Sequence, residues 1–218
     1  MTSQKRTPVE TFDRLIDWDT SLTPRDQFFD AVTGDEQLRI KYGADITAST
    51  LHLGHGVNLR TMREMQDMGH KVVFLLGGFT TLVGDPTDQL QTRKSVDTGS
   101  IEENKKNFID QVGTILNFDD PDLIEVRDNL EWWGDMPQID MFKLLSTVSL
   151  KKLMSRDMFR KRMEQDVPIK MSEFLYPVLQ GYDSVKTASD ITVVGSDQLF
   201  NEAMGREFQK DAGQTPQM

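Results

Sequence analysis

Two histidines that flank a glycine form the pattern with the clearest chemistry in this sequence. His52 and His55 stand on either side of Gly54, between a predicted strand and a predicted helix. At the start of a helix the backbone N–H groups are unpaired and the dipole is positive, so anions bind there. Imidazoles can hydrogen-bond phosphate oxygens as negative charge builds on them. We therefore predict a nucleotide phosphate site, in preference to capping histidines. Because only one other histidine, His70, is present, we expect no histidine-rich metal site.

Three further polar clusters lie where ligands would be expected in an α/β protein. They are the glycine-rich run 77–86, the set Tyr176, Gln180 and Asp183, and the turn 195–198. The first and third follow predicted strands, and open parallel sheets bind ligands at the carboxyl ends of their strands. The middle set recurs at helical spacing, so its three side chains share one helix face. A row of hydrogen-bonding groups is costly in a core unless a polar ligand meets it.

The elements that must position these clusters follow from hydrophobic spacing. Period-two or short apolar runs predict strands at 38–42, 71–76, 123–127 and 190–194. Helical spacing predicts helices at 11–18, 24–32, 57–68, 101–116, 139–165, 172–182 and 196–210. The polar stretch 85–99 is predicted to be a mobile loop. Strand, helix and strand in succession indicate a parallel βαβ unit, so we expect an α/β fold with a mainly parallel sheet and a helical insertion.

Composition excludes several classes of function. The 218 residues carry a formal charge of −10 and no cysteine, which excludes disulfide scaffolds, thiolate zinc sites and cysteine nucleophiles. There is no apolar run long enough to span a membrane and no N-terminal signal peptide, so we expect a cytoplasmic enzyme or binding domain. Six basic residues within 151–162 predict either a solvated helix face or a surface that contacts nucleic acid.

Taken together, the four clusters resemble the catalytic domain of bacterial tyrosyl-tRNA synthetases, which are class I aminoacyl-tRNA synthetases. The stretches that carry the likeness are LRIKYGADITASTLHLGH, GDPT…TRK, EFLYPVLQGYDSV and GSDQLFN. Helical spacing predicts a helical lead-in over 1–34, and the resemblance implies a Rossmann-like catalytic domain over 35–218 that is truncated at its C-terminus. The resemblance also implies a helical connective insertion at roughly 100–175 that forms a homodimer interface.

The resemblance further implies that the protein joins tyrosine to ATP, with Mg²⁺ accompanying the nucleotide, and passes tyrosine from the adenylate to tRNA(Tyr). Matched residue by residue, the catalytic set is His52, His55, Thr47 and Arg93. The set implied for ATP is Asp45, His52, Gly54, His55, Gly195 and Asp197. The set implied for tyrosine is Thr80, Asp85, Tyr176, Gln180, Asp183 and Gln198. Among these, Asp183 is implied to accept a hydrogen bond from the tyrosine hydroxyl.

The family's Lys-Met-Ser-Lys-Ser loop and its C-terminal tRNA-binding region would follow Met218, so we expect tyrosine binding, weak activation and negligible tRNA charging from this chain.

Two alternatives to this synthetase hypothesis remain open. Ile46, Gln89 and Val194 depart from the family pattern and favour a non-catalytic relative that binds tyrosine or its adenylate. A different nucleotidyl-transferring ligase, such as one that activates tryptophan or pantoate, is the other alternative.

Overall fold

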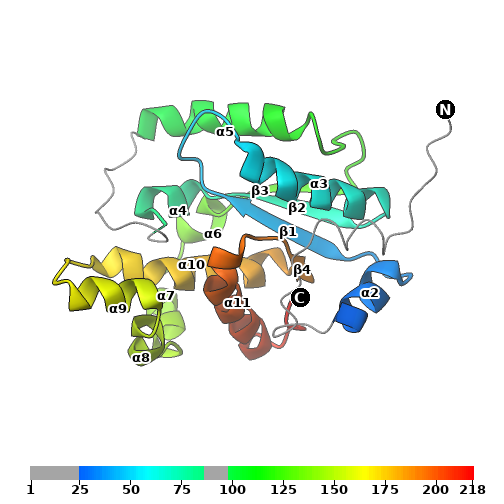
Figure 1. Cartoon of the computed structure of the whole chain (residues 1–218). Helices are drawn as coiled ribbons and strands as arrows, with labels where there is room; N and C mark the ends of the chain where they lie inside the picture. Colours follow the sequence, from blue (N-terminus) through cyan, green and yellow to red (C-terminus); the bar gives the residue numbers. More distant parts are fainter. Residues whose placement is uncertain (1–24, 86–97) are drawn as a thin grey trace, which may run out of the picture.

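A four-stranded parallel sheet organises the molecule. The computed structural model describes residues 25–85 and 98–218. The strands run in the order β3-β2-β1-β4, and every neighbouring pair is parallel. Their bounds are β1 (Arg39–Ala44), β2 (Lys71–Leu76), β3 (Ile124–Asp128) and β4 (Ile191–Thr192). Figure 1 shows the sheet between two layers of helices, which confirms the α/β fold expected from the sequence.

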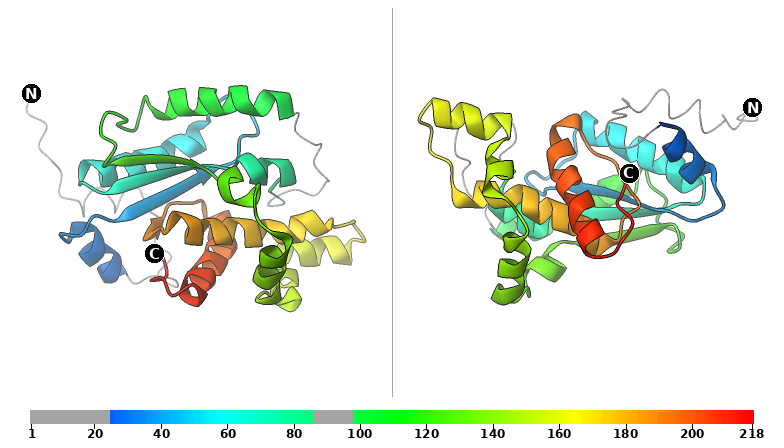
Figure 2. Two further views of the ribbon diagram at one scale, coloured as in Figure 1. Left: turned by 180° about the vertical axis from the view of Figure 1, so that it is seen from behind. Right: turned by 90° about the horizontal axis from the view of Figure 1, so that it is seen from below.

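The alternation of side chains along the strands separates the two faces of the sheet. On one face Ile40, Tyr42 and Phe74 belong to the main hydrophobic core. Helices α3 (Leu53–Asp67) and α5 (Thr98–Val112) cover this face, as Figure 2 shows from behind. Because successive side chains on a strand point to opposite faces, Lys41 and Leu75 lie on the other side. The polar Lys41 is therefore directed away from the main core.

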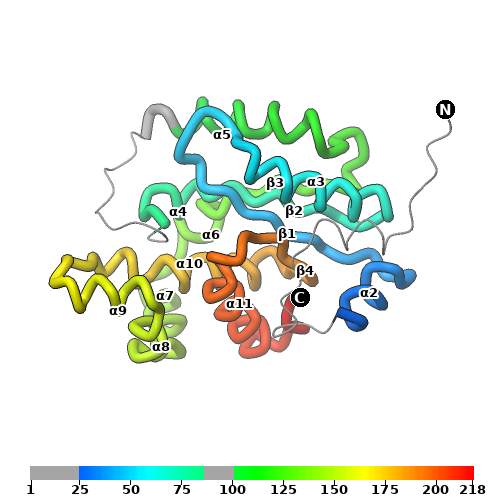
Figure 3. The backbone as a smooth tube through the Cα atoms, in the orientation of Figure 1, coloured from blue at the N-terminus to red at the C-terminus, as the bar shows by residue number. Residues whose placement is uncertain are grey.

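Two crossed helices, α10 (Met171–Thr187) and α11 (Leu199–Asp211), lie against that other side. They meet at two glycines. A Cβ atom on Gly181 would lie 3.0 Å from the backbone nitrogen of Gly205, and one on Gly205 would lie 2.7 Å from the Ser184 hydroxyl. Glycine at these positions therefore lets the two backbones approach closely. In the tube trace, β1 passes between α3 on one side and the α10–α11 pair on the other (Figure 3).

The helical insertion differs from the expected range of roughly 100–175. Within that range β3 pairs with β2 in the parallel sheet, and α5 covers the main core, so both belong to the sheet unit. The helical part that follows comprises α6 (Leu130–Trp133), α7 (Gln138–Ser146), α8 (Leu150–Met154) and α9 (Asp157–Glu164). The segment 139–165, predicted to be helical, consists of three helices separated by short breaks. Ser149 and Arg156 adopt extended backbone and begin new helices, and the preceding Thr147 and Val148 have low helix propensity.

Other boundaries shift by a few residues. Helix α3 begins at Leu53 rather than at 57, because His52 caps its first turn, and α10 continues to Thr187. Helix α2 (Arg25–Thr33) packs Phe28 into the main core. The helix predicted at 11–18 and most of the loop predicted at 85–99 lie outside the described residues. No helix in the described part of the chain is long and apolar enough to cross a membrane.

The basic cluster at 151–162 does not form one solvated helix face. Arg162 is buried and forms an ion pair with Glu173, and Arg156 is also buried. Lys152 pairs with Glu207 across to α11. Three of the six are wholly or partly buried, and the exposed members are Lys151, Arg160 and Lys161, of which Arg160 pairs with Asp157.

The close contact between α10 and α11 predicts that a side chain at Gly181 lowers the stability of the protein. In Gly181→Ala the added methyl group would press on the backbone of α11 and on the Phe208 ring, so we expect the free energy of unfolding to fall by about 1–3 kcal/mol. The matched control is Gly56→Ala, in helix α3, where an added Cβ meets nothing within 4 Å. That change should raise the free energy of unfolding by about 0.5–1 kcal/mol. Urea unfolding followed by circular dichroism measures both, and equal effects would contradict the close crossing.

Candidate active site

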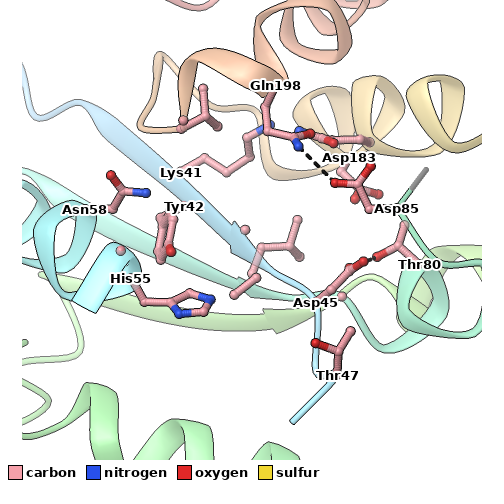
Figure 4. A pocket seen from close by; sticks show the side chains of 18 of the residues that line it. Lys41, Tyr42, Asp45, Thr47, His55, Asn58, Thr80, Asp85, Asp183 and Gln198 are labelled. Carbon is pink, nitrogen blue, oxygen red and sulfur yellow. Dashed lines mark hydrogen bonds between the residues drawn. The ribbon is translucent and has the colours of Figure 1, made fainter. Parts of the chain in front are cut away.

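One cavity of about 700 Å³ opens at the carboxyl end of β1. It is bounded by the loop after β1, the start of α3, one face of α10 and the turn before α11, as the close-up in Figure 4 shows. The predicted site residues that line it are Asp45, Thr47, His52, Gly54, His55, Thr80, Asp85, Tyr176, Gln180, Asp183, Gly195, Asp197 and Gln198. Arg93 lies outside the described residues. The histidine turn and the polar face of α10 thus line the same cavity, although their nearest members in sequence, His55 and Tyr176, are 121 positions apart.

The histidine turn presents two imidazoles in a defined state. The backbone N–H of Gly54 donates to Nδ1 of His52 at 3.1 Å, and the backbone N–H of His52 donates to Nδ1 of His55 at 3.2 Å. Both Nδ1 atoms therefore accept, which leaves Nε2 as the protonated nitrogen of each neutral ring. Burial, together with the charge of His52, lowers the pKa of His55 below its usual value. The lowered pKa favours the neutral form of His55, and the turn offers Nε2–H donors suited to phosphate oxygens.

Asp45 ties α10 to helix α4 (Gly78–Val83) across the end of the sheet. Its Oδ1 accepts from the Thr80 hydroxyl at 2.7 Å, and its Oδ2 accepts from the Tyr176 hydroxyl at 2.9 Å. A Cβ atom on Gly77 would lie 2.2 Å from Oδ1 of Asp45, so the close approach needs glycine there. Burial and then the negative charges of Asp45 and Asp85 raise the pKa of Tyr176 well above its usual value. Tyr176 is therefore a neutral phenol whose hydroxyl donates a hydrogen bond to Asp45.

Asp183 lies at the buried end of the polar face, with only 3% of its surface exposed. Its Oδ1 accepts from both indole N–H groups of Trp132 and Trp133 at 2.8 Å, and its Oδ2 accepts from the side-chain amide of Asn129 at 3.1 Å. A carboxylate has about four acceptor positions, so roughly one remains on Oδ2. Burial raises the pKa of Asp183 to about 7, although these three donors and the charge of Lys41 favour the ionised form.

Two glutamine amides of the predicted tyrosine set bond carboxylates at the cavity wall. Gln198 donates from Nε2 to Oδ2 of Asp85 at 2.9 Å, a bond drawn in Figure 4. Gln180 donates from Nε2 to Oε1 of Glu202 at 2.8 Å. Asn201 donates to the side-chain oxygens of both glutamines, so Asp85, Gln198 and Gln180 belong to one hydrogen-bonded network.

Several residues of the site escape the sequence analysis. They are Tyr42, Asn58, Asn129, Trp132, Trp133, Asn201 and Glu202. Helical spacing offered one signal, since Glu202 lies four residues after Gln198 and Ser184 lies four residues after Gln180. The two tryptophans gave none, because a pair of tryptophans is equally expected in a core.

The sequence matches a known family of enzymes. The family model described as "tRNA synthetases class I (W and Y)" matches residues 33–218. The chain belongs to this family of class I tRNA synthetases. Among curated relatives, a tyrosine--tRNA ligase of Thiobacillus denitrificans is 46% identical over 180 residues, 83% of this chain and 45% of that protein. One of Synechococcus sp. is 42% identical over 183 residues, 84% of this chain and 44% of that protein. The chain thus spans less than half the length of these synthetases.

Solved structures of synthetases share the fold. A C-terminally truncated mitochondrial tyrosyl-tRNA synthetase of Aspergillus nidulans superposes with a TM-score of 0.76 at 25% identity, over 94% of this chain and 61% of that one. A tyrosyl-tRNA synthetase of Archaeoglobus fulgidus, complexed with L-tyrosine, gives a TM-score of 0.61 at 19% identity, over 83% of this chain and 53% of that one. At that identity the second likeness concerns the fold alone.

The raised pKa of Asp183 makes the stability of this synthetase domain depend on pH. An unfolded aspartate titrates near pH ~4, so between about pH 4 and 7 the folded state holds a proton that the unfolded state lacks. The free energy of unfolding should therefore fall as pH rises through this window. From pH 5 to pH 8 we expect Asp183 to contribute a loss of about 2–3 kcal/mol.

Urea unfolding at several pH values measures that loss as the difference between the wild type and Asp183→Asn. Asp122→Asn, on the surface, is the matched control and should follow the wild type. If the stability curves of wild type and Asp183→Asn ran parallel from pH 5 to pH 8, the raised pKa would be refuted.

Proposed function

We propose that the protein activates L-tyrosine with ATP and supplies the activated amino acid to tRNA(Tyr). The observation that carries the proposal is the single cavity in which a phosphate-type histidine turn faces a polar helix face ending in a buried carboxylate. Tyrosine is the amino acid that such a cavity suits, because its phenol needs an acceptor deep in an otherwise closed site. The curated relatives bear the name tyrosine--tRNA ligase, and the family description covers tyrosine and tryptophan.

Under this proposal the amino acid lies along α10. Its phenol hydroxyl donates to the remaining acceptor position on Oδ2 of Asp183. Its amino group is met by Asp85, Tyr176, Gln180 and Gln198, with Thr80 next to them; these side chains supply anionic or neutral oxygens. The carboxylate end then points toward the histidine turn.

The chemical step needs no covalent intermediate with the protein. A carboxylate oxygen of tyrosine attacks the α-phosphorus of ATP, and the bond to the bridging oxygen breaks to release pyrophosphate. His52 and His55, with Thr47, are placed to donate to the phosphates as charge moves onto the leaving group. Gly195 and Asp197, on the turn before α11, are placed to hold the ribose and the adenylate, with Gly54 close to the nucleotide. The nucleotide enters as its Mg²⁺ complex, and Arg93 is proposed to meet pyrophosphate.

The same proposal includes a homodimer and a cytoplasmic location. Helix α7 has no buried residue and exposes two large apolar side chains, Ile139 and Phe142. Exposed apolar groups on one helix are typical of a surface that another protein covers. Transfer of tyrosine would bring the acceptor end of tRNA to the cavity mouth.

A specific alternative is a relative that binds tyrosine or the adenylate without catalysis. Val194 lines the cavity next to Gly195, where a side chain can crowd a bound adenylate. Ile46 is fully buried in the main core, so its side chain is not offered to a ligand. Gln89 lies outside the described residues.

Ligand preference tests the proposal directly. Titration calorimetry with L-tyrosine, L-phenylalanine and L-tryptophan should show tyrosine binding more tightly than phenylalanine by roughly 10- to 100-fold, because phenylalanine leaves the charged acceptor unpaired. Asp183→Asn should reduce this ratio, whereas Asp122→Asn should preserve it. A preference for tryptophan would overturn the tyrosine assignment. Exchange of labelled pyrophosphate into ATP then separates the two candidates, since tyrosine binding without any exchange favours the non-catalytic relative.

A further inference from the structure

A buried ion pair lies at the wall of the cavity, outside every role assigned above. Nζ of Lys41 lies 2.8 Å from Oε2 of Glu202, and the two side chains are 2% and 4% exposed. Lys41 also donates to the Ser184 hydroxyl at 2.6 Å, and Gln217 donates to the same Oε2 at 2.7 Å. Removing two charges from water costs several kcal/mol per ion, so such a pair is a poor device for stability alone.

The second oxygen of Glu202 fixes the amide of Gln180. Oε1 of Glu202 accepts from Nε2 of Gln180 at 2.8 Å. A carboxylate only accepts hydrogen bonds, so the NH₂ end of Gln180 must face Glu202 and the oxygen end must face the other way. Lys41 and Gln217 occupy Oε2, which leaves Oε1 for this bond.

Asn201 fixes the side-chain amide of Gln198 in the same way. Its Nδ2 donates to Oε1 of Gln180 at 2.7 Å and to Oε1 of Gln198 at 2.8 Å. Its own Oδ1 finds no hydrogen-bond partner among the described residues. A reversed Asn201 amide would place that oxygen against two other amide oxygens, which repel it. At the far end, Nε2 of Gln198 donates to the carboxylates of Asp85 and Asp197 at 2.9 and 2.7 Å.

We infer that Lys41, Glu202 and Asn201 are positioning residues that fix the side-chain amides of Gln180 and Gln198. In the fixed orientation each amide oxygen keeps one lone pair for a ligand, and neither NH₂ group competes with the cationic amino group of an amino acid. In the reversed orientation the amides would present N–H groups to that cation and repel it. The inference rests on the proposed function only in the identity of the ligand.

Two isosteric variants test the inference through ligand affinity. Glu202→Gln can both donate and accept, so the orientation of Gln180 is no longer dictated. Asn201→Asp replaces the shared donor with an oxygen. Each should weaken L-tyrosine binding by roughly tenfold in calorimetry. Binding of 3-(4-hydroxyphenyl)propionate, which lacks the amino group, should change by less than about twofold. The matched control is Glu207→Gln on the exposed side of α11, which should bind both ligands as the wild type does.

General damage to the cavity would weaken both ligands alike, so an equal loss for tyrosine and for the propionate would overturn the inference. Unchanged tyrosine affinity in Glu202→Gln would overturn it as well. If the wild-type chain binds neither ligand, the proposed function fails.

Hydrogen exchange of side-chain amides tests the fixed orientation without any ligand or variant. In the ¹⁵N-labelled wild-type chain, the Nε2 protons of Gln180 should exchange at least ~10-fold more slowly than those of Gln138, which is exposed on α7. Equal exchange rates would show that the Gln180 amide is not held, and the inference would fall even if tyrosine bound as proposed.

Discussion

The close crossing of α10 and α11 is the contact on which the site depends. Because neither Gly181 nor Gly205 carries a side chain, the two backbones approach closely enough for polar groups on one helix to bond those on the other. Gln180 and Ser184 on α10 thereby reach Glu202 on α11. Larger residues at the crossing would push the helices apart and break these bonds. The cavity wall is thus set by the absence of two side chains.

Two buried carboxylates border the same cavity and have opposite surroundings. Asp183 is bonded by neutral N–H donors, and burial raises its pKa to about 7. Glu202 is paired with the Lys41 ammonium and bonded to two amides. A carboxylate surrounded by neutral donors keeps acceptor capacity for an incoming hydroxyl, whereas one that is paired with a cation serves to hold its neighbours. Different environments thus give the same functional group different tasks.

The hydrogen bonds within the histidine turn are set by nearby residues, whereas its position opposite α10 depends on the whole fold. His52 caps α3 through its own ring, and the two backbone N–H bonds decide which nitrogen of each imidazole is protonated. The turn needs only the sequence around it to adopt this state. What it faces across the cavity, however, is the polar face of α10, which the sheet places there by pairing β1 with both β2 and β4.

The sequence by itself was enough for the fold class, for the four strands in their order along the chain, and for the four clusters at the ends of strands and on one helix face. These features depend on local spacing: β2 runs from Lys71 to Leu76 as predicted, and Tyr176, Gln180 and Asp183 share a face because a helix repeats every 3.6 residues. The breaks within 139–165 escaped prediction because apolar residues continue across them: Leu145, Val148 and Leu153 pack in one hydrophobic cluster with α10 and α11, so hydrophobic spacing alone does not mark where one helix ends.

The partners of the buried charges were decided only by the tertiary structure. Trp132 and Trp133 reach Asp183 across about fifty residues, and Lys41 reaches Glu202 across 161 residues. No local sequence pattern predicts these contacts. They form only when the sheet and the α10–α11 crossing bring side chains that are distant in sequence together in a buried region of low dielectric constant.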